Sequence, residues 1–202
     1  MRTELISMAF DESFLLPFFL NHYLFVDKIH LMVDSDTTDG TREIAAEYPN
    51  VEVSEFTFPS GMDDILKKDL LNAKYKTISA DYCILVDTDE FIFDYQSIDG
   101  SKDIYFTDLF DVYRHVSEND LDVNEPVWLQ RRHGTFNSMY RKPNIVRCGL
   151  ENFKWGLGIH ECLLGSESHS CWNTGRADLI GAHWQMADYF CVDRRVKGRR
   201  DR

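Results

Sequence analysis

Residues 82–91, YCILVDTDEF, decide the fold of this chain. The first five, Tyr82–Val86, form a short apolar run without polar alternation, which predicts a strand buried on both faces. Asp87 and Asp89 follow directly, one residue apart. A D-x-D pattern also occurs in solvated turns, but three successive acids beyond a buried strand favour a site where a cation pairs them. Hard divalent cations prefer such oxygen ligands and leave positions open for phosphates.

Two further strands are expected to end in acids in the same way. The run at 5–10 precedes Asp11 and Glu12, and the run at 29–33 precedes Asp34 and Asp36. We also expect a strand at 51–56 and helices at 13–26, 42–48 and 62–78. Apolar strands that alternate with helices predict an α/β fold with a mostly parallel sheet covered by helices on both faces. Ligands of such sheets bind at the carboxyl ends of the strands.

The stretch 34–41, DSDTTDGT, follows the expected strand at 29–33 and is rich in turn residues. We expect Thr38, Asp39 and Thr41 to be structural, because their oxygens accept hydrogen bonds from free amides at a helix start. Asp34 and Asp36 are expected to face a ligand. A calcium loop is excluded, since the sixth and twelfth positions are Asp39 and Ala45 where Gly and Glu are required.

The charge composition bears on which kinds of ligand the protein can bind. The 202 residues include 22 Lys and Arg against 34 Asp and Glu, a net charge of −12. Such an acidic chain is not expected to bind nucleic acid, which requires clustered cations. An odd number of cysteines, no signal peptide and no apolar run long enough to span a membrane predict a cytoplasmic protein. The length predicts one domain, 1–202.

The second half is less regular. We expect a helix at 107–116, a loop at 117–125, strands at 127–130, 144–147 and 177–183, and a closing helix at 186–197. The last nine residues, 194–202, hold six bases and one acid. This tail is expected either to be solvated or to make weak peripheral contact with the inner face of an anionic membrane.

The segments DESFLLPFFLNHY (11–23), DSDTTDGT (34–41) and DTDEF (87–91), in this order, resemble a family 2-type glycosyltransferase with the GT-A fold. The resemblance covers about the first 95 residues. It departs from the family at Asp11, where Asn is usual, and at Phe18 and Phe19, which replace an acid and a Trp. It implies that 1–95 binds a nucleotide-sugar donor and that 96–202 completes the metal site and binds the acceptor.

Carried over by position, the resemblance implies roles for the acids. Asp11, Glu12, Asp34 and Asp36 would bind the nucleotide-sugar. Asp87 would lie near the ribose and the metal with its waters, and Asp89 would ligate Mn²⁺ or Mg²⁺. The cation would neutralise the nucleoside diphosphate leaving group.

The second half offers three candidates. The stretch 155–161, WGLGIHE, loosely resembles a loop whose final acid, here Glu161, is the base of some inverting GT-A enzymes; the alternative is a surface Glu on a glycine-rich turn. His183 is expected to complete the metal shell or to be a core histidine. Lys142 in RKPNIVR (141–147) resembles a family motif that binds the donor. Neighbouring bases could form a cationic wall or a solvated face: Arg131, Arg132, Arg141 and Arg147.

The sequence therefore predicts a metal-dependent glycosyltransferase, inverting, that acts on a glycan or lipid-linked acceptor in envelope or surface glycan synthesis. Two alternatives remain. A haloacid-dehalogenase-type phosphatase also has a D-x-D after a strand, although Phe91 stands where that motif needs Thr or Val. A catalytically inactive nucleotide- or sugar-binding domain would carry the same residues.

Overall fold

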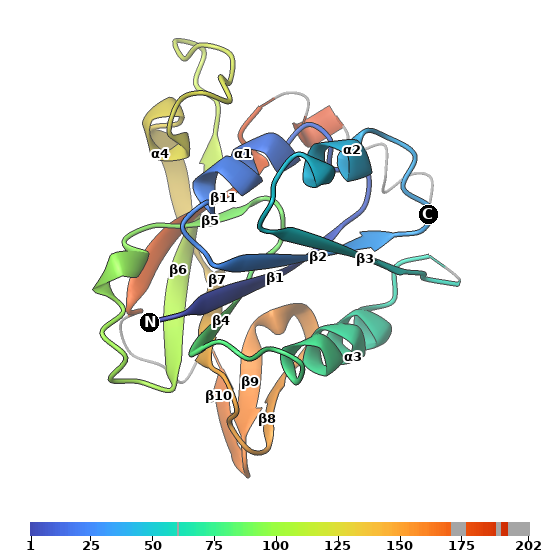
Figure 1. The fold of residues 1–202 in the computed structure, drawn as a ribbon. Coiled ribbons are helices and arrows are strands. Elements are labelled where there is room, and N and C mark those ends of the chain that lie inside the picture. Colours follow the sequence, from blue (N-terminus) through green and yellow to red (C-terminus); the bar gives the residue numbers. More distant parts are fainter. Residues whose placement is uncertain (60, 171–176, 189–190, 194–202) are drawn as a thin grey trace.

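In the computed structural model, the structure describes residues 1–59, 61–170, 177–188 and 191–193. An eight-stranded sheet has the order β3-β2-β1-β4-β7-β6-β11-β5 (Figure 1). Its strands are β1 (Thr3–Ala9), β2 (Lys28–Asp34), β3 (Val51–Phe56), β4 (Tyr82–Leu85), β5 (Glu90–Ile92), β6 (Ile104–Tyr113), β7 (His133–Arg147) and β11 (Leu179–Met186). The strands β3, β2, β1 and β4 are parallel, and so are β6 and β11, whereas β7 and β5 pair antiparallel. The α/β class with a mostly parallel, mixed sheet is confirmed.

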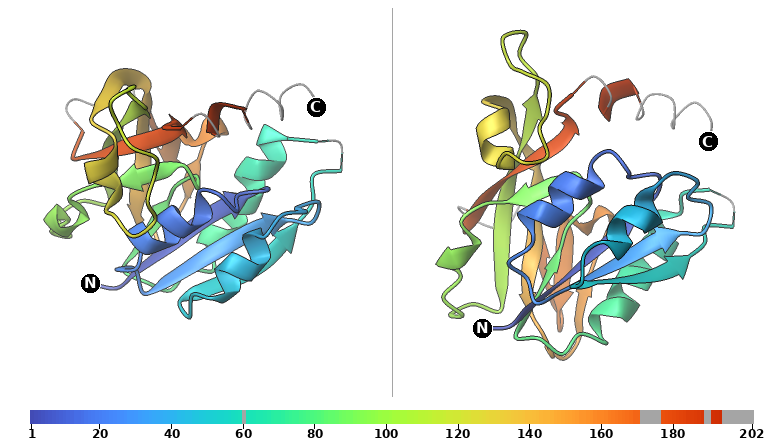
Figure 2. Two further views of the ribbon diagram at one scale, coloured as in Figure 1. Left: turned by 90° about the horizontal axis from the view of Figure 1, so that it is seen from above. Right: turned by 45° about the horizontal axis from the view of Figure 1, so that its top comes forward.

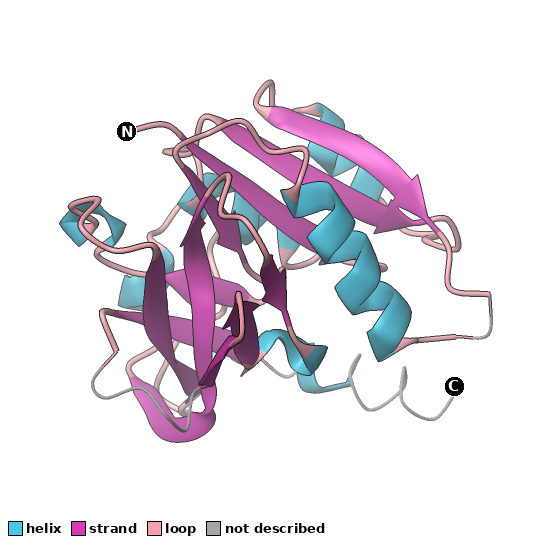
Figure 3. Ribbon diagram, turned by 90° about the horizontal axis from the view of Figure 1, so that it is seen from below, coloured by secondary structure: helices cyan, strands magenta, loops and turns pink. Residues whose placement is uncertain are grey.

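Helices cover both faces of this sheet. The helices α1 (Leu16–His22) and α2 (Thr41–Ala46) lie on one face, and α3 (Asp64–Tyr75) lies on the other (Figures 1 and 2). A second sheet of β8 (Phe153–Trp155), β9 (Glu161–Leu164) and β10 (Glu167–Ser170) lies beside α3 (Figure 3). Each face has its own apolar core, one built around α1 and the other around α3 and β8.

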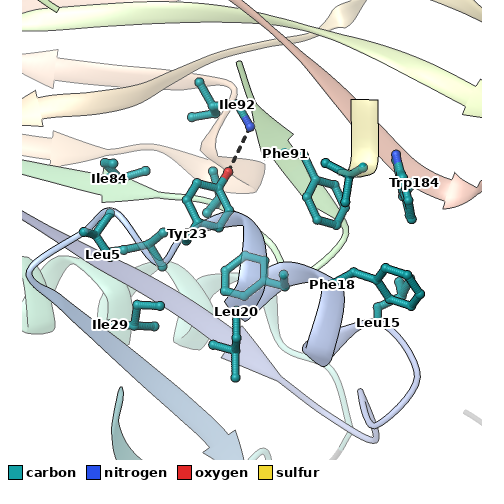
Figure 4. Packing of buried hydrophobic residues seen from close by; sticks show 14 of the residues in the cluster. Leu5, Leu15, Phe18, Leu20, Tyr23, Ile29, Ile84, Phe91, Ile92 and Trp184 are labelled. Atoms are coloured by element: carbon teal, nitrogen blue, oxygen red, sulfur yellow. Dashed lines mark hydrogen bonds between the residues drawn. The ribbon is translucent and has the colours of Figure 1, made fainter. Parts of the chain in front are cut away.

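The core under α1 fixes the segment that carries the acids. The Tyr23 hydroxyl donates to the Glu90 carbonyl at 3.0 Å and accepts from the Ile92 amide at 2.9 Å (Figure 4). The Phe91 ring packs 4.8 Å from Trp184 on β11. Strand β5 is thereby held between α1 and β11, and this anchors the loop that precedes it.

Predictions for the first half agree with the structure to within a few residues. Strands expected at 5–10, 29–33, 51–56 and 82–86 are β1, β2, β3 and β4, and the expected helices are α1, α2 and α3 with shorter bounds. Asp63 caps α3, its Oδ1 accepting from the amides of Ile65 at 2.9 Å and Leu66 at 3.0 Å. Phe18 and Phe19 are buried in the core, as expected of packing residues.

Two predictions for the second half are wrong. Residues 107–116 do not form a helix; most of them belong to strand β6, between β7 and β11, where their aromatic and β-branched side chains pack on a sheet. Residues 127–130 are not a strand but the short helix α4 (Val127–Gln130), which begins after Pro126. Proline is suited to a helix start because it has no amide hydrogen to satisfy.

Boundaries also shift near the end of the chain. The strand expected at 144–147 is the last part of the longer β7, and the one at 177–183 lies largely within β11. The closing helix cannot begin at Met186, because this residue ends β11 and pairs with Tyr113. Residues 191–193 are helical, and 194–202, with the expected membrane contact, lie outside the described residues.

Candidate functional site

The strands that precede the three acid pairs are neighbours in the sheet. Strand β1 pairs parallel with β2 on one side and with β4 on the other. Their carboxyl ends therefore lie at one edge, and the segments at 11–12, 34–36 and 87–89 leave the sheet there. This edge is the candidate site.

The Asp11 and Asp39 side chains tie two of these loops together. Asp11, with φ of 51°, accepts through Oδ1 from the amides of Thr38 at 2.8 Å and Asp39 at 3.3 Å. Asp39 accepts from the Ser13 amide at 2.9 Å and from the Thr41 amide at 3.0 Å. Burial would raise the pKa of Asp39, but these hydrogen bonds outweigh it and lower the pKa. The structural role expected of Asp39 and Thr41 is confirmed.

The other residues of these loops differ in exposure. Asp34 is buried, and its Oδ1 accepts from the Asp36 amide at 3.0 Å, whereas the Asp36 side chain is exposed. Glu12 is half-buried, and its amide donates to the Thr41 hydroxyl at 2.8 Å. The structure therefore gathers Asp11, Glu12, Asp34 and Asp36 at the edge, and of these four side chains Asp36 is the exposed one.

Asp87 lies between two lysines. Lys67 on α3 donates to Asp87 Oδ1 at 2.8 Å, and Lys142 on β7 lies 3.4 Å from Oδ2. Lys142 is buried and also pairs with the buried Glu90, whose Oε2 accepts from the Asp87 amide at 3.1 Å. Burial would raise the pKa of Asp87, but the two ammonium groups outweigh it and hold the pKa well below its usual range. Asp87 is therefore a fixed, ionised carboxylate.

Asp89 faces His183 instead. The His183 Nε2 atom lies 3.4 Å from Asp89 Oδ2, and its Nδ1 donates to Asp111 Oδ1 at 2.9 Å. The Asp89 carbonyl accepts from the Trp184 amide at 2.7 Å, which ties the loop to β11. Burial would lower the pKa of His183, but the hydrogen bond and charge of Asp89 outweigh it and raise the pKa to about 9. The same contact, against the effect of burial, lowers the pKa of Asp89.

Strand register sets this row of carboxylate, imidazole and carboxylate. His183 on β11 stands opposite Asp111 of the parallel strand β6 and opposite Glu90 of the antiparallel strand β5. Gln185, two residues further along β11, donates to the same Asp111 oxygen at 2.8 Å. The buried Asp111 thus holds the imidazole at Nδ1 and leaves Nε2 directed at Asp89.

Sequence reasoning missed Lys67 and Asp111. Lys67 looked like an exposed position of an amphipathic helix, and its contact with Asp87 depends on how α3 packs. Asp111 fell within a segment that we expected to be helical, so its position opposite His183 was hidden. Glu90 stood in the DTDEF motif directly before the apolar Phe91 and Ile92, and the structure shows it buried in strand Glu90–Ile92.

Glu161 lies away from the acid edge. It is exposed at the start of β9 and lines a groove of about 510 Å³ between this strand and α3. Gly156 leaves room for this side chain: a Cβ at Gly156 would lie 2.4 Å from Glu161 Cγ, and the Gly156 amide donates to the Glu161 carbonyl at 2.8 Å. Glu161 makes no hydrogen bond to Asp87 or Asp89 within the described part of the chain.

The basic residues of the second half do not form one cationic wall. Arg131 is buried and pairs with Asp188 at 3.1 Å. Arg141 pairs with Asp108 at 2.5 Å, and Arg147 pairs with Asp103 at 2.7 Å. Arg132 is exposed. Lys142 is the one of these bases that contacts Asp87. Of the two readings of these bases, the shared wall is wrong, because Arg131, Arg141 and Arg147 each have a separate carboxylate partner.

The acid edge offers few ligands for a metal ion. Across 1–59, 61–170, 177–188 and 191–193, no group of three or more His, Cys, Asp or Glu side chains is arranged to hold an ion. Asp89 and His183 nevertheless offer one oxygen and one nitrogen 3.4 Å apart, with the imidazole fixed from behind by Asp111. These two residues fit a divalent cation that takes its remaining ligands from water and a bound phosphate. Both Asp87 oxygens face lysines, so its place in a metal shell stays a prediction.

No protein-family model matches the sequence, and no curated protein matches it. The structure is similar to that of S. aureus TarS 1–349 in complex with UDP-GlcNAc, with a TM-score of 0.47 and 17% identity over 93% of this chain and 57% of that chain. It is also similar to glucosyl-3-phosphoglycerate synthase from Mycobacterium tuberculosis in complex with Mn²⁺, UDP and phosphoglyceric acid, with a TM-score of 0.39 and 15% identity over 57% of this chain and 44% of that chain. This chain thus spans less than two thirds of either protein. The likeness concerns the path of the chain and says nothing about which residues act.

None of the helices within the described residues is long and apolar enough to cross a membrane.

Proposed function

We propose that this protein is a nucleotide-sugar-dependent glycosyltransferase of the GT-A kind, which transfers a sugar to an acceptor hydroxyl with inversion. The observation that carries the proposal is the row Asp89–His183–Asp111 at the carboxyl edge of β4, beside an Asp87 fixed by two lysines. In this proposal 1–202 is one catalytic unit, in which 1–95 binds the donor and 96–202 binds the acceptor.

Asp89 and His183 would hold Mn²⁺ or Mg²⁺. Such a cation, when bound, neutralises the charge that develops on a nucleoside diphosphate leaving group. His183 must present a neutral Nε2 to a metal, and Asp111 supports this by accepting the proton on Nδ1. Asp89 contributes a carboxylate that a ligand can reach, since 26% of its side-chain surface is exposed.

The donor would lie across the edge formed by β2, β1 and β4. Asp87, kept ionised by Lys67 and Lys142, would accept hydrogen bonds from the ribose or from metal-bound water. The loops at 11–12 and 34–36 would bind the nucleoside; the exposed Asp36 is the most open to a ligand. The Asp11 carboxylate instead holds the backbone of 38–39 in place.

Glu161 would remove the acceptor proton. It is an exposed carboxylate in a groove, and the absence of a side chain at Gly156 leaves the space that Glu161 occupies. A carboxylate base in direct contact with an acceptor hydroxyl suffices for a single in-line displacement at the sugar carbon, which inverts its configuration. The groove shares α3 with the candidate donor site, since Lys67 of this helix contacts Asp87.

The test is a thermal-shift screen of nucleotide diphosphates and nucleotide-sugars, each with and without Mn²⁺. A ligand at 100 times its dissociation constant adds about 2.7 kcal/mol to the free energy of unfolding. We expect stabilisation that requires both nucleotide and metal and that is lost in Asp89→Ala. Stabilisation without hydrolysis of the sugar donor would favour a binding domain over an enzyme. No stabilisation by any nucleotide would refute the proposal.

A further inference from the structure

The groove that holds Glu161 has the size of a small-molecule site. Its volume of about 510 Å³ falls within the range of about 300–1,000 Å³ that ligand pockets occupy. One wall is α3 and the other is β8 and β9, with the small sheet beside the helix in Figure 3. Asn72 fastens the two walls together, since its side chain accepts from the Trp155 amide at 2.9 Å and donates to the Trp155 carbonyl at 3.0 Å. The groove is therefore a built feature of the fold.

Cations gather around this groove in a chain that is otherwise acidic. Lys68, Lys76 and Lys154 line it, whereas the whole sequence carries a net charge of −12. Lys68 pairs with the exposed Asp69 at 3.2 Å. Lys76 and Lys154 have no ion-pair partner among the residues that the structure describes. Two unpaired ammonium groups, one from the end of α3 and one from β8, thus face the same hollow.

The groove also has apolar surface and a carboxylate. Trp155 forms part of its floor, and the Leu157 side chain beside it is 53% exposed. The exposed leucine suits the carbon face of a sugar ring or a polyol chain, whereas the Trp155 side chain is buried. Glu161 supplies the carboxylate, so the groove combines a base, an apolar wall and two free cations.

Its position links it to the candidate donor site. Lys67 contacts Asp87, and the next residue, Lys68, lines the groove. On the opposite wall the Trp155 indole donates to the Pro143 carbonyl at 2.9 Å, next to Lys142, which also contacts Asp87. The two sites are thus connected through α3 on one side and through β7 on the other.

We infer that this groove binds the acceptor and that the acceptor carries an anionic group, a phosphate or a carboxylate, close to the hydroxyl that receives the sugar. This rests on the proposed function for the assignment of Glu161 as base. Lys76 and Lys154 would pair with the anion, while the exposed Leu157 would contact the carbon skeleton. The chemistry common to phosphate esters and sugar acids is a negative charge on a polyhydroxylated body, and it matches this surface.

The experiment is an NMR titration of the ¹⁵N-labelled protein with glucose 6-phosphate, glucuronate and glucose, with the Trp155 indole and the Gly156 amide as reporters. We expect both anions, or one of them, to bind at least about tenfold more tightly than glucose, a factor within reach of two ion pairs. The double variant Lys76→Gln with Lys154→Gln is expected to remove this preference. The control double variant Lys28→Gln with Lys102→Gln changes the net charge equally, and both residues lie outside the groove. This control is expected to keep the preference for anions.

Binding of one anion alone identifies the acceptor's charged group. Equal binding of all three probes, or a preference that survives in the groove variant, would overturn the inference. UDP binding with Mn²⁺ is titrated on the same samples. If the groove shows its anion preference but UDP never binds, the proposed function fails and the groove remains an anion site; if UDP binds and the preference is absent, only the groove inference fails.

Discussion

Replacing Asp111 by Asn tests the part of the site that the sequence concealed. Asp111 accepts from His183 Nδ1 at 2.9 Å and from Gln185 Nε2 at 2.8 Å, and it is 7% exposed. Asn has nearly the same shape, and its side-chain carbonyl can still accept both hydrogen bonds. What it lacks is the negative charge behind the imidazole. Asp111→Asn therefore separates the electrostatic role of this residue from its place in the packing.

The expected magnitude follows from the role of such outer partners. Loss of a carboxylate that supports a metal-binding histidine lowers metal affinity about 10- to 100-fold, or about 1.4–2.8 kcal/mol. Asp111→Ala differs, because it leaves two buried donors without an acceptor at a cost of about 1–3 kcal/mol each in the free energy of unfolding. We expect Asp111→Asn to lose Mn²⁺ affinity with little loss of stability, and Asp111→Ala to lose both.

The assay counts free Mn²⁺ by electron paramagnetic resonance as the metal-free protein is titrated, and urea unfolding of each variant gives its stability. Asp108→Asn is the matched control: it lies on the same strand and also removes a paired carboxylate, but its partner is Arg141. It is expected to keep wild-type Mn²⁺ affinity. If Asp111→Asn binds Mn²⁺ within about twofold of wild type while His183→Ala does not bind, Asp111 has no electrostatic role and the reasoning is refuted.

Three other predictions concern separate residues. Asp89→Ala is expected to abolish Mn²⁺-dependent stabilisation by UDP while the metal-free protein stays folded, since the Asp89 carbonyl that holds Trp184 is kept; calorimetric binding unchanged from wild type would contradict this. Glu161→Gln is expected to keep UDP affinity and lose sugar transfer by about 10²–10⁴-fold, measured in single-turnover assays. Burial lowers the pKa of His22 from 6.5 to about 4, so its contribution to stability is complete above pH 6.5 and is lost, by about 3 kcal/mol, as the pH falls toward 4. Urea unfolding measured from pH 7 to 4 should show a smaller loss of stability in His22→Gln than in wild type. The control His115→Gln, whose ring is exposed, should lose as much stability as wild type.

The first half of the fold was predictable from the sequence because its signals are local. The runs that form β1, β2 and β4 are mostly apolar, interrupted by Ser7 in β1 and His30 in β2, and each is followed by acids or a turn. Continuous burial without alternation implies a sheet covered on both faces, and short helices between strands imply parallel pairing. Parallel neighbours bring their carboxyl ends together, so the acid edge followed from the order of segments alone.

The second half was not predictable in the same way because long-range pairing decides it. Strand β6 pairs with the distant β7 and β11, and its sequence reads equally well as an amphipathic helix when its partners are unknown. Once β6 was assigned to the wrong class, no argument could place Asp111 opposite His183, because that register joins positions 72 residues apart. The contact between Lys67 and Asp87 likewise depends on the packing of α3.

The structure also gives the acids of the D-T-D-E sequence unequal roles, which their spacing does not suggest. Glu90 is buried against Lys142 and accepts the Asp87 amide, so it shapes the loop. Asp87 has an ammonium group at each oxygen, so its charge is already balanced before any ligand arrives. Asp89 faces an imidazole, which can give up its proton and offer the same nitrogen to a cation. A positive ion entering this edge thus meets two neutralised carboxylates and one whose partner can become a ligand. For this reason we place the metal at Asp89 and His183, and the lysines beside Asp87 leave that carboxylate to orient the rest of the donor.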